Sequence, residues 1–243
     1  MPYRKEQFVN DEIYHILLRG IDNNLIFKDI NDYYRGIFSI YEFNNSRSVE
    51  IIKRRQEIQT IKKKLKERGE RISSISDRRD KLVEVLAFCF MPNHIHLLVR
   101  QLKNGGITKF MRKVGAGYGR YFNRRYGRRG YVFQNRFSAI HIKNNEQLKT
   151  VFVYIHTNPT ALIESNWKEK GIKNPKKIIK FLEAYKWSSY SDYIGRKNFP
   201  SVTERNFILE IMKNEKGCKK FVDYWIKYKG KIRKKFAKLT LEE

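Results

Sequence analysis

The residues best suited to chemistry are two histidines, His94 and His96, in the segment MPNHIHLLV at residues 91–99. In a β-strand, residues i and i+2 point to the same face, so the two imidazoles project side by side while Ile95 and Leu97 point into the opposite layer. Two neutral imidazoles in that arrangement can share a metal ion. An isolated His-x-His pair in an apolar strand is more often a core or hydrogen-bonding feature, so the metal interpretation depends on the rest of the chain.

A second group of chemical interest is the segment VYIHTNP at residues 153–159. Tyr154 and Asn158 are four residues apart, which places them on nearly the same face of a helix. Tyr154 lies at the edge of an apolar stripe that is expected to face the sheet, which leaves its hydroxyl free for a site; the stripe comprises Leu148, Phe152 and Ile155. Proline disfavours the helical conformation of the residue before it, so we expect the Asn158 side chain to be offset from its position on an ideal helix. The alternative is a core tyrosine followed by an asparagine near the end of a helix.

The elements that must position these residues follow the order strand, helix, strand, strand, helix, strand, helix. The expected strands are residues 11–19, 82–91, 94–100 and 136–142, and the expected helices are residues 29–43, 105–126 and 146–157. Pro92 and Asn93 mark a tight turn, while Asn144 and Asn145 can cap the last helix, which Pro159 stops. This order predicts an α+β fold with helices packed on an antiparallel sheet.

Two segments lie outside this pattern. Residues 46–81 predict a charged helical insertion, with a helical hairpin broken near residues 69–76 as one form of it. A DNA-contacting arm and a solvated insertion are both open interpretations. Residues 167–243 are basic and predicted to be mostly helical, with helices at 207–212 and 221–228 and fraying after residue 231. We therefore expect a main domain at residues 1–195, including the insertion, and a basic helical C-terminal extension at residues 196–243.

The chain is strongly basic, with 52 Lys and Arg against 25 Asp and Glu in 243 residues, a formal net charge of +27. A field of this sign attracts polyanions, and nucleic acid is the leading partner. A membrane surface and a generally basic proteome are weaker explanations. No apolar run reaches the roughly 18 residues of a membrane span, and the two cysteines imply no disulfide framework and no cysteine-based zinc site. We expect no membrane partner and a cytoplasmic protein that associates with the nucleoid when bound to DNA.

The His-x-His segment after Met-Pro-Asn, followed downstream by YIHTNP at residues 154–159, resembles the HUH single-tyrosine transposases. Within them the chain is most similar to the REP-associated tyrosine transposases and their relatives in the insertion-sequence 200/605 group. Three flanking segments also resemble this family: residues 14–20, 132–137 and 186–190. The resemblance covers residues 12–192 apart from the charged insertion.

The resemblance implies a ferredoxin-like or RRM-like sheet, the HUH endonuclease fold. It implies that His94, His96 and Asn158 bind Mg²⁺ or Mn²⁺ and that Tyr154 is the nucleophile. The implied reaction is metal-dependent cleavage of single-stranded, hairpin-bearing DNA through a 5′-phosphotyrosine, followed by strand transfer in DNA transposition. A catalytically inactive DNA-binding protein on the same fold and an HUH nickase of replication or mobilisation are the alternatives. Both a monomer and a homodimer are open.

DNA contacts are expected from basic and aromatic residues around these segments. The loop at residues 126–136 interleaves the two types, which suits tracking of a single-stranded backbone and stacking of its bases; the alternative is a flexible surface loop. For His15, a role in the strand core is as well supported as a DNA contact. We expect His141 and His156 to be structural or surface residues. The candidate DNA-binding residues are His15, Arg19, Arg112, Arg120, Arg128, Arg129, Tyr131 and Arg136.

Overall fold

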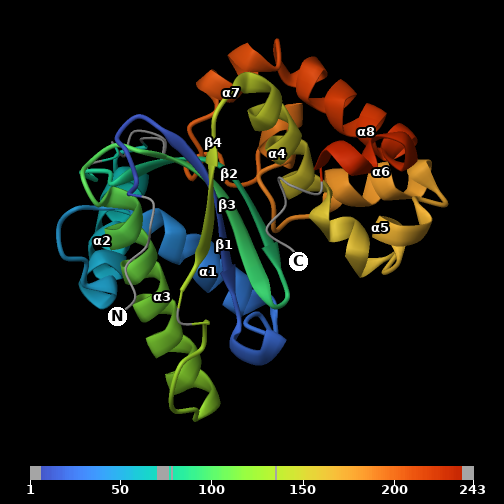
Figure 1. Cartoon of the computed structure of the whole chain (residues 1–243). Helices are drawn as coiled ribbons and strands as arrows, with labels where there is room; N and C mark the ends of the chain where they lie inside the picture. Colours follow the sequence, from blue (N-terminus) through green and yellow to red (C-terminus); the bar gives the residue numbers. More distant parts are fainter. Residues whose placement is uncertain (1–6, 70–76, 78, 135, 237–243) are drawn as a thin grey trace.

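The computed structural model describes residues 7–69, 77, 79–134 and 136–236. Its centre is a four-stranded antiparallel sheet with the strand order β2-β3-β1-β4 (Figure 1). The strands are β1 (Ile13–Arg19), β2 (Val83–Met91), β3 (His94–Gln101) and β4 (Ser138–Ile142). With α1 (Ile30–Glu42) after β1 and α3 (Gly106–Tyr126) after β3, the chain follows the β-α-β-β-α-β order of the ferredoxin-like fold. The predicted α+β architecture is confirmed.

Helices α1 and α3 cover one face of the sheet (Figure 1). Alternate strand residues, including Ile16, Leu18, Ile95 and Leu97, point into this layer and are buried against the two helices. Helix α1 begins after Asp29, whose carboxylate accepts hydrogen bonds from the backbone N–H groups of Asn31 and Asp32 at 2.9 and 3.2 Å. This cap satisfies donors that the first helical turn leaves without a partner.

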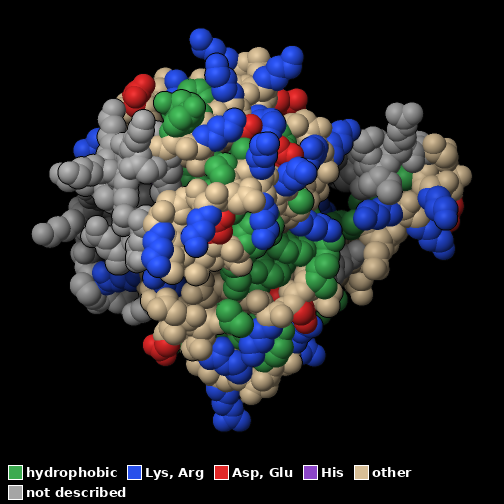
Figure 2. Space-filling model, turned by 90° about the vertical axis from the view of Figure 1, so that its right-hand side faces the viewer, with side chains coloured by type: hydrophobic (Ala, Val, Ile, Leu, Met, Phe, Trp, Pro, Cys, Tyr) green, Lys and Arg blue, Asp and Glu red, His purple; other side chains and the backbone are tan. Residues whose placement is uncertain are grey.

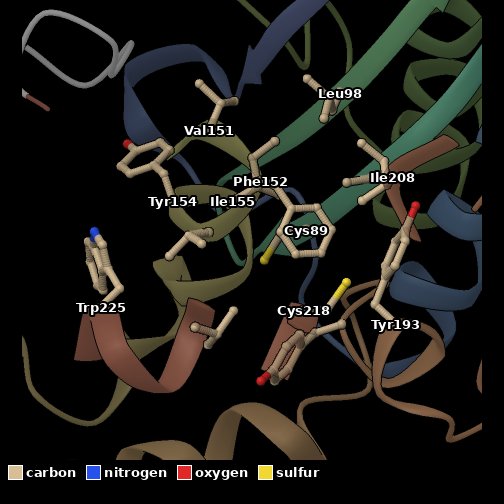
Figure 3. Packing of buried hydrophobic residues seen from close by; sticks show 14 of the residues in the cluster. Cys89, Leu98, Val151, Phe152, Tyr154, Ile155, Tyr193, Ile208, Cys218 and Trp225 are labelled. Atoms are coloured by element: carbon tan, nitrogen blue, oxygen red, sulfur yellow. The ribbon is translucent and has the colours of Figure 1, made fainter. Parts of the chain in front are cut away.

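The opposite face is covered by α4 (Asn145–Thr157) and by helices from the C-terminal part of the chain. These are α5 (Trp167–Lys170), α6 (Pro175–Ala184), α7 (Asn206–Ile211) and α8 (Glu215–Phe236). Helix α8 packs along α4 and contributes Cys218, Val222, Trp225 and Ile226 to the core of this layer (Figure 3). The C-terminal segment is therefore part of the core on this side. As a result every α4 residue from 151 to 157 is buried.

The segment around Trp187 closes the outer edge of β2. The backbone N–H of Phe90 donates to the carbonyl of Trp187 at 2.8 Å, and the N–H of Ser189 donates to the carbonyl of Phe88 at 3.0 Å. Covering an edge strand in this way removes a template for unwanted pairing. Residues 186–190, which carry part of the family resemblance, thus complete the sheet.

The charged insertion contains the helix α2 (Ile51–Glu67), which lies beside the α1 and α3 layer (Figure 1). Its Arg54 forms an ion pair with Glu42 of α1 at 3.3 Å. The expected break of a helical hairpin falls largely on residues 70–76, which lie outside the described residues. Among the described residues, none of the helices has the length and hydrophobicity of a membrane span.

Two expected helix ends differ from the structure. The chain stays helical past Thr157 and continues through Pro159 as the 3₁₀-helix η3 (Asn158–Leu162). Proline is tolerated there because it occupies the first turn, where its missing N–H has no helical partner. The second difference is in α8, which continues to Phe236, beyond the expected onset of fraying. Two shorter 3₁₀-helices are η1 (Ile21–Asn23) and η4 (Ser191–Ile194).

Candidate active site between the sheet and helix α4

The two histidines of β3 lie side by side on the sheet face that α4 covers. The ring centroids of His94 and His96 are 4.8 Å apart, and the rings are nearly perpendicular at 87°. In the β1–β3 ladder they face Arg19 and Leu17 respectively. His96 is fully buried, whereas His94, nearer the end of the strand, is 8% exposed. The expectation that both imidazoles project to one face is confirmed.

Tyr154 reaches this pair from α4. Its ring centroid lies 5.6 Å from that of His96 and 5.9 Å from that of His15, both in edge-to-face geometry. The ring belongs to the apolar layer that also contains Val151 and Trp225 (Figure 3). The imidazole pair of β3 and the phenol of α4 therefore meet in one place, although His96 and Tyr154 are 58 residues apart in the chain.

The Tyr154 hydroxyl is buried, and it forms no hydrogen bond with any residue that the structure describes. The side chain as a whole is only 4% exposed, because the C-terminal helices cover the outer side of α4. Burial raises the pKa of Tyr154 above the ordinary value, and the nearby Asn158 amide and the positive charge of Arg19 oppose this shift. The hydroxyl is therefore protonated at neutral pH and, contrary to expectation, enclosed.

Asn158 lies one turn beyond Tyr154 and is also buried. Its backbone is helical, with φ −51° and ψ −40°, so the expected offset from helical projection is wrong. Its side-chain N–H donates to the Tyr154 backbone carbonyl at 3.3 Å. The 3₁₀ continuation of the helix keeps Asn158 on the side of α4 where Tyr154 lies.

His15 has a different environment from a DNA-contacting residue. It is fully buried, and its Nε2 lies 3.0 Å from Nδ1 of His96, at hydrogen-bonding distance. The two rings stack with centroids 5.2 Å apart. Burial, with a smaller effect from His96, lowers the pKa of His15 well below its usual value, so the ring is neutral. The burial argues against a direct DNA contact, and the alternative of a strand-core residue describes its position.

The turn that carries His94 is held from two sides. Oδ1 of Asn93 accepts a hydrogen bond from His94 Nδ1 at 2.7 Å. The backbone N–H of Gly20 donates to the carbonyl of Asn93 at 2.8 Å, and the N–H groups of Ile26 and Phe27 donate to the carbonyl of Pro92. These contacts were not predicted, since they depend on the pairing of β1 with β3. The one sequence signal was glycine directly after the first strand.

The remaining candidate DNA-binding residues fall into two groups. Arg19 ends β1 opposite His94. The backbone N–H of Gln134 donates to the Arg19 carbonyl at 2.9 Å. This hydrogen bond ties the neighbouring loop to the same end of the sheet, and the loop carries Arg128, Arg129, Tyr131 and Arg136. Tyr131 is 77% exposed. Arg112 and Arg120, in contrast, lie on α3, across the sheet from Tyr154.

His141 and His156 have structural partners. His156 is fully buried, and its Nε2 lies 2.8 Å from the Ser189 hydroxyl oxygen. Burial lowers the pKa of His156 to about 3. His141 pairs with Glu12 at 2.7 Å on the other face of the sheet. The site histidines are thus His94 and His96, with His15 behind them.

A divalent cation fits the donor types present. No cluster of three or more His, Cys, Asp or Glu side chains suited to a metal occurs within the described ranges. The candidate set is instead two imidazoles 4.8 Å apart and the amide of Asn158. All three donors are neutral, so a bound ion would keep its full charge for an anionic substrate. Imidazole and amide donors with open positions suit Mn²⁺, and Mg²⁺ when water or substrate oxygens complete the shell.

The fold and the site together define a ferredoxin-like protein with paired strand histidines beneath a helix tyrosine. Residues 44–158 match the model of the family described as IS200-like transposases, a range that contains His94, His96, Tyr154 and Asn158. This match spans a little less than half of the chain, and over that range the chain is similar to the DNA transposases of this family. No functionally curated protein matches its sequence. A solved structure of a REP-associated tyrosine transposase bound to a REP hairpin is similar at 15% identity, over 85% of this chain and 96% of that chain, with a TM-score of 0.39.

Proposed function

We propose that the chain cleaves single-stranded, hairpin-bearing DNA with Tyr154 as nucleophile and transfers the cut strand in DNA transposition. The observation that carries this proposal is the meeting of the Tyr154 ring with His96, at a centroid distance of 5.6 Å, beside His94. Cleavage of a phosphodiester needs an oxygen nucleophile in line with the leaving oxygen and positive charge beside the phosphoryl oxygens. A phenol and a cation-binding imidazole pair on one face supply both.

In the proposed reaction the Tyr154 oxygen attacks the phosphorus and the bond from phosphorus to the 3′-oxygen breaks. The phenolic proton leaves the tyrosine, and the departing 3′-oxygen gains a proton to become a 3′-hydroxyl. The new 5′-phosphotyrosine ester conserves the bond energy, so a 3′-hydroxyl of another strand can reverse the step without ATP. This is covalent catalysis that divides one transfer into two steps.

His94, His96 and Asn158 are the residues that would hold Mg²⁺ or Mn²⁺. When bound, such an ion polarises the phosphate and orients it for in-line attack. Arg19 and the loop residues Arg128, Arg129 and Arg136 would contact the DNA backbone at the same end of the sheet. The exposed Tyr131 ring would add a surface for base stacking.

The first test is the formation of a covalent adduct with a single-stranded hairpin oligonucleotide in Mn²⁺, read on a denaturing gel. Wild type is expected to form a protein–DNA adduct and Tyr154→Phe to form none. Tyr224→Phe is the matched control, because Tyr224 is 56% exposed on α8 and takes no part in the proposed site. An adduct of normal yield in Tyr154→Phe would exclude Tyr154 as the nucleophile.

The second test separates catalysis from binding. His94→Ala and His96→Ala are expected to lose cleavage while keeping most of the affinity for DNA, since the basic surface is unchanged. Cleavage at the wild-type rate in either variant would exclude a cation held by the histidine pair. Binding without cleavage in wild type, over a range of hairpin substrates, would favour the inactive DNA-binding alternative.

A further inference from the structure

Of the histidines that contact the site, only the fully buried His15 has no role in the proposed chemistry. On the face covered by α4, His15 of β1 is opposite Leu98 and His96 of β3 is opposite Leu17. The two histidines are therefore diagonal neighbours across the strand pair, close enough for long side chains to meet. Their contact joins Nε2 of His15 to Nδ1 of His96 at 3.0 Å, with both side chains fully buried.

A contact between two imidazole nitrogens can hold one hydrogen, so one ring donates and the other accepts. If His96 donates from Nδ1, its Nε2 keeps a lone pair and can bind a cation. If His15 donates instead, a neutral His96 carries its hydrogen on Nε2 and cannot be a ligand through that nitrogen. The direction of this single hydrogen bond thus decides whether His96 is a competent ligand.

The hydrogen bond of His94 shows which direction suits the hydrogen bond between His15 and His96. His94 Nδ1 lies 2.7 Å from Oδ1 of Asn93, and an amide oxygen only accepts. His94 therefore carries its hydrogen on Nδ1, which leaves Nε2 as its ligand nitrogen. The same tautomer at His96 requires His15 Nε2 as the acceptor. Both candidate ligands would then use Nδ1 for an internal partner and Nε2 for the cation.

We propose that His15 is a positioning residue, which accepts the Nδ1 hydrogen of His96 and thereby holds its Nε2 ready for a divalent cation. Asn93 does the same for His94. The inference rests on the proposed function, because it assigns a purpose to ligands that the proposed function names. Partners that orient metal-binding histidines commonly account for about 10–100-fold in metal affinity.

The test uses the full chain, Mn²⁺ alone and no DNA. Calorimetric titration is expected to show 10–100-fold weaker Mn²⁺ binding by His15→Leu, which removes the acceptor and leaves the His96 N–H without its partner. His15→Gln offers an amide oxygen close to the position of Nε2 and is expected to restore affinity to within a few-fold of wild type. His141→Leu is the matched control, since His141 lies on the neighbouring strand β4, on the opposite face.

Long-range ¹H–¹⁵N NMR correlations of wild type provide a second readout that does not depend on any variant folding. They are expected to show His96 protonated at Nδ1 and not at Nε2. Mn²⁺ affinity of His15→Leu equal to wild type would overturn the role of His15 while leaving the metal site of the proposed function intact. His96 protonated at Nε2 would also overturn the role of His15, and the metal site would then stand only if the same wild-type sample still binds Mn²⁺. Wild type that binds no Mn²⁺ would overturn both.

Discussion

At the scale of single residues, Tyr154 combines its proposed role as nucleophile with an unreactive environment. Its hydroxyl is enclosed, and burial raises the pKa of the phenol above its ordinary value. A protonated phenol is a weak nucleophile, so activation needs a neighbouring charge or base. Arg19 already opposes the rise in the pKa. The free enzyme is thus expected to keep Tyr154 unreactive until DNA and a cation reach the site.

His156 allows a prediction about stability and pH. Burial lowers its pKa to about 3 in the folded protein, against about 6.5 in the unfolded chain. A lowered pKa means that the folded state resists protonation. The stability that the neutral ring confers is fully present above pH 6.5 and is lost as the pH falls from about 6.5 towards 3, by up to about 1.4 kcal/mol per pH unit.

Urea unfolding at pH 7.5, 5.5 and 4.5 measures this effect. His156→Gln keeps a donor for the Ser189 hydroxyl but cannot titrate, so its free energy of unfolding is expected to fall less steeply with acid than that of wild type. Equal slopes for wild type and His156→Gln would show that the ring is not held neutral by burial.

At the scale of elements, the close approach of β1 to the turn before β3 positions His94. A Cβ atom on Gly20 would lie 2.4 Å from the Asn24 carbonyl oxygen and 3.2 Å from that of Asn93, both backbone atoms. Gly20→Ala is therefore expected to displace the turn, to cost roughly 1–3 kcal/mol of stability and to lower the DNA cleavage rate. Chemical denaturation and the adduct assay measure the two effects.

The control for Gly20→Ala is another glycine in ordinary surroundings. In α3 a Cβ on Gly115 would meet its nearest atom, of Phe133, at 4.0 Å. Gly115→Ala is expected to leave cleavage unchanged and to stabilise the helix by about 0.5–1 kcal/mol. Wild-type stability and cleavage in Gly20→Ala would contradict the positioning role of this contact.

Much of the fold follows from local patterns in the sequence. The period-two alternation around His94 and His96 predicts their shared face, and the 3.6-residue spacing predicts α1, α3 and α4. The burial of Tyr154 could not be predicted, because it depends on α8 packing over α4 from some 70 residues further along the chain. The partnership of His15 and His96 depends on the register of β1 against β3, which no local pattern encodes.

At the scale of the whole molecule, the chain carries a formal net charge of +27. Basic side chains outnumber acidic ones on the face shown in Figure 2. Helix α2 adds the exposed run Lys62, Lys63 and Lys64. Between α2 and α3 lies a groove of about 1060 Å³, whose lining includes Lys113, Arg120 and Arg124. This arrangement favours the interpretation of the insertion as a DNA-contacting arm.

Replacing Lys62, Lys63 and Lys64 together by Gln tests this arm. Lys and Gln have similar helix propensities, so α2 is expected to persist. The affinity for single-stranded DNA should fall, and the slope of log K against log salt should shrink by up to roughly 2, at about 0.7 per lost phosphate contact. Fluorescence anisotropy over a series of salt concentrations measures both quantities.

The matched control removes three lysines of α6, Lys176, Lys177 and Lys180, and so lowers the net charge equally. It is expected to keep the wild-type salt slope within error. The same loss of affinity and slope in both triple variants would show that charge acts over the whole surface and not through α2.

Mass spectrometry of the covalent adduct, after digestion with nuclease and trypsin, determines whether the Tyr154 oxygen becomes joined to DNA. The tryptic peptide at residues 150–168 contains Tyr154 as its single tyrosine. We predict a nucleotide phosphate attached to this peptide, at residue 154, in a sample incubated with hairpin DNA and Mn²⁺. An adduct on a different tyrosine, or DNA that is cut with no covalent link to the protein, would contradict this prediction.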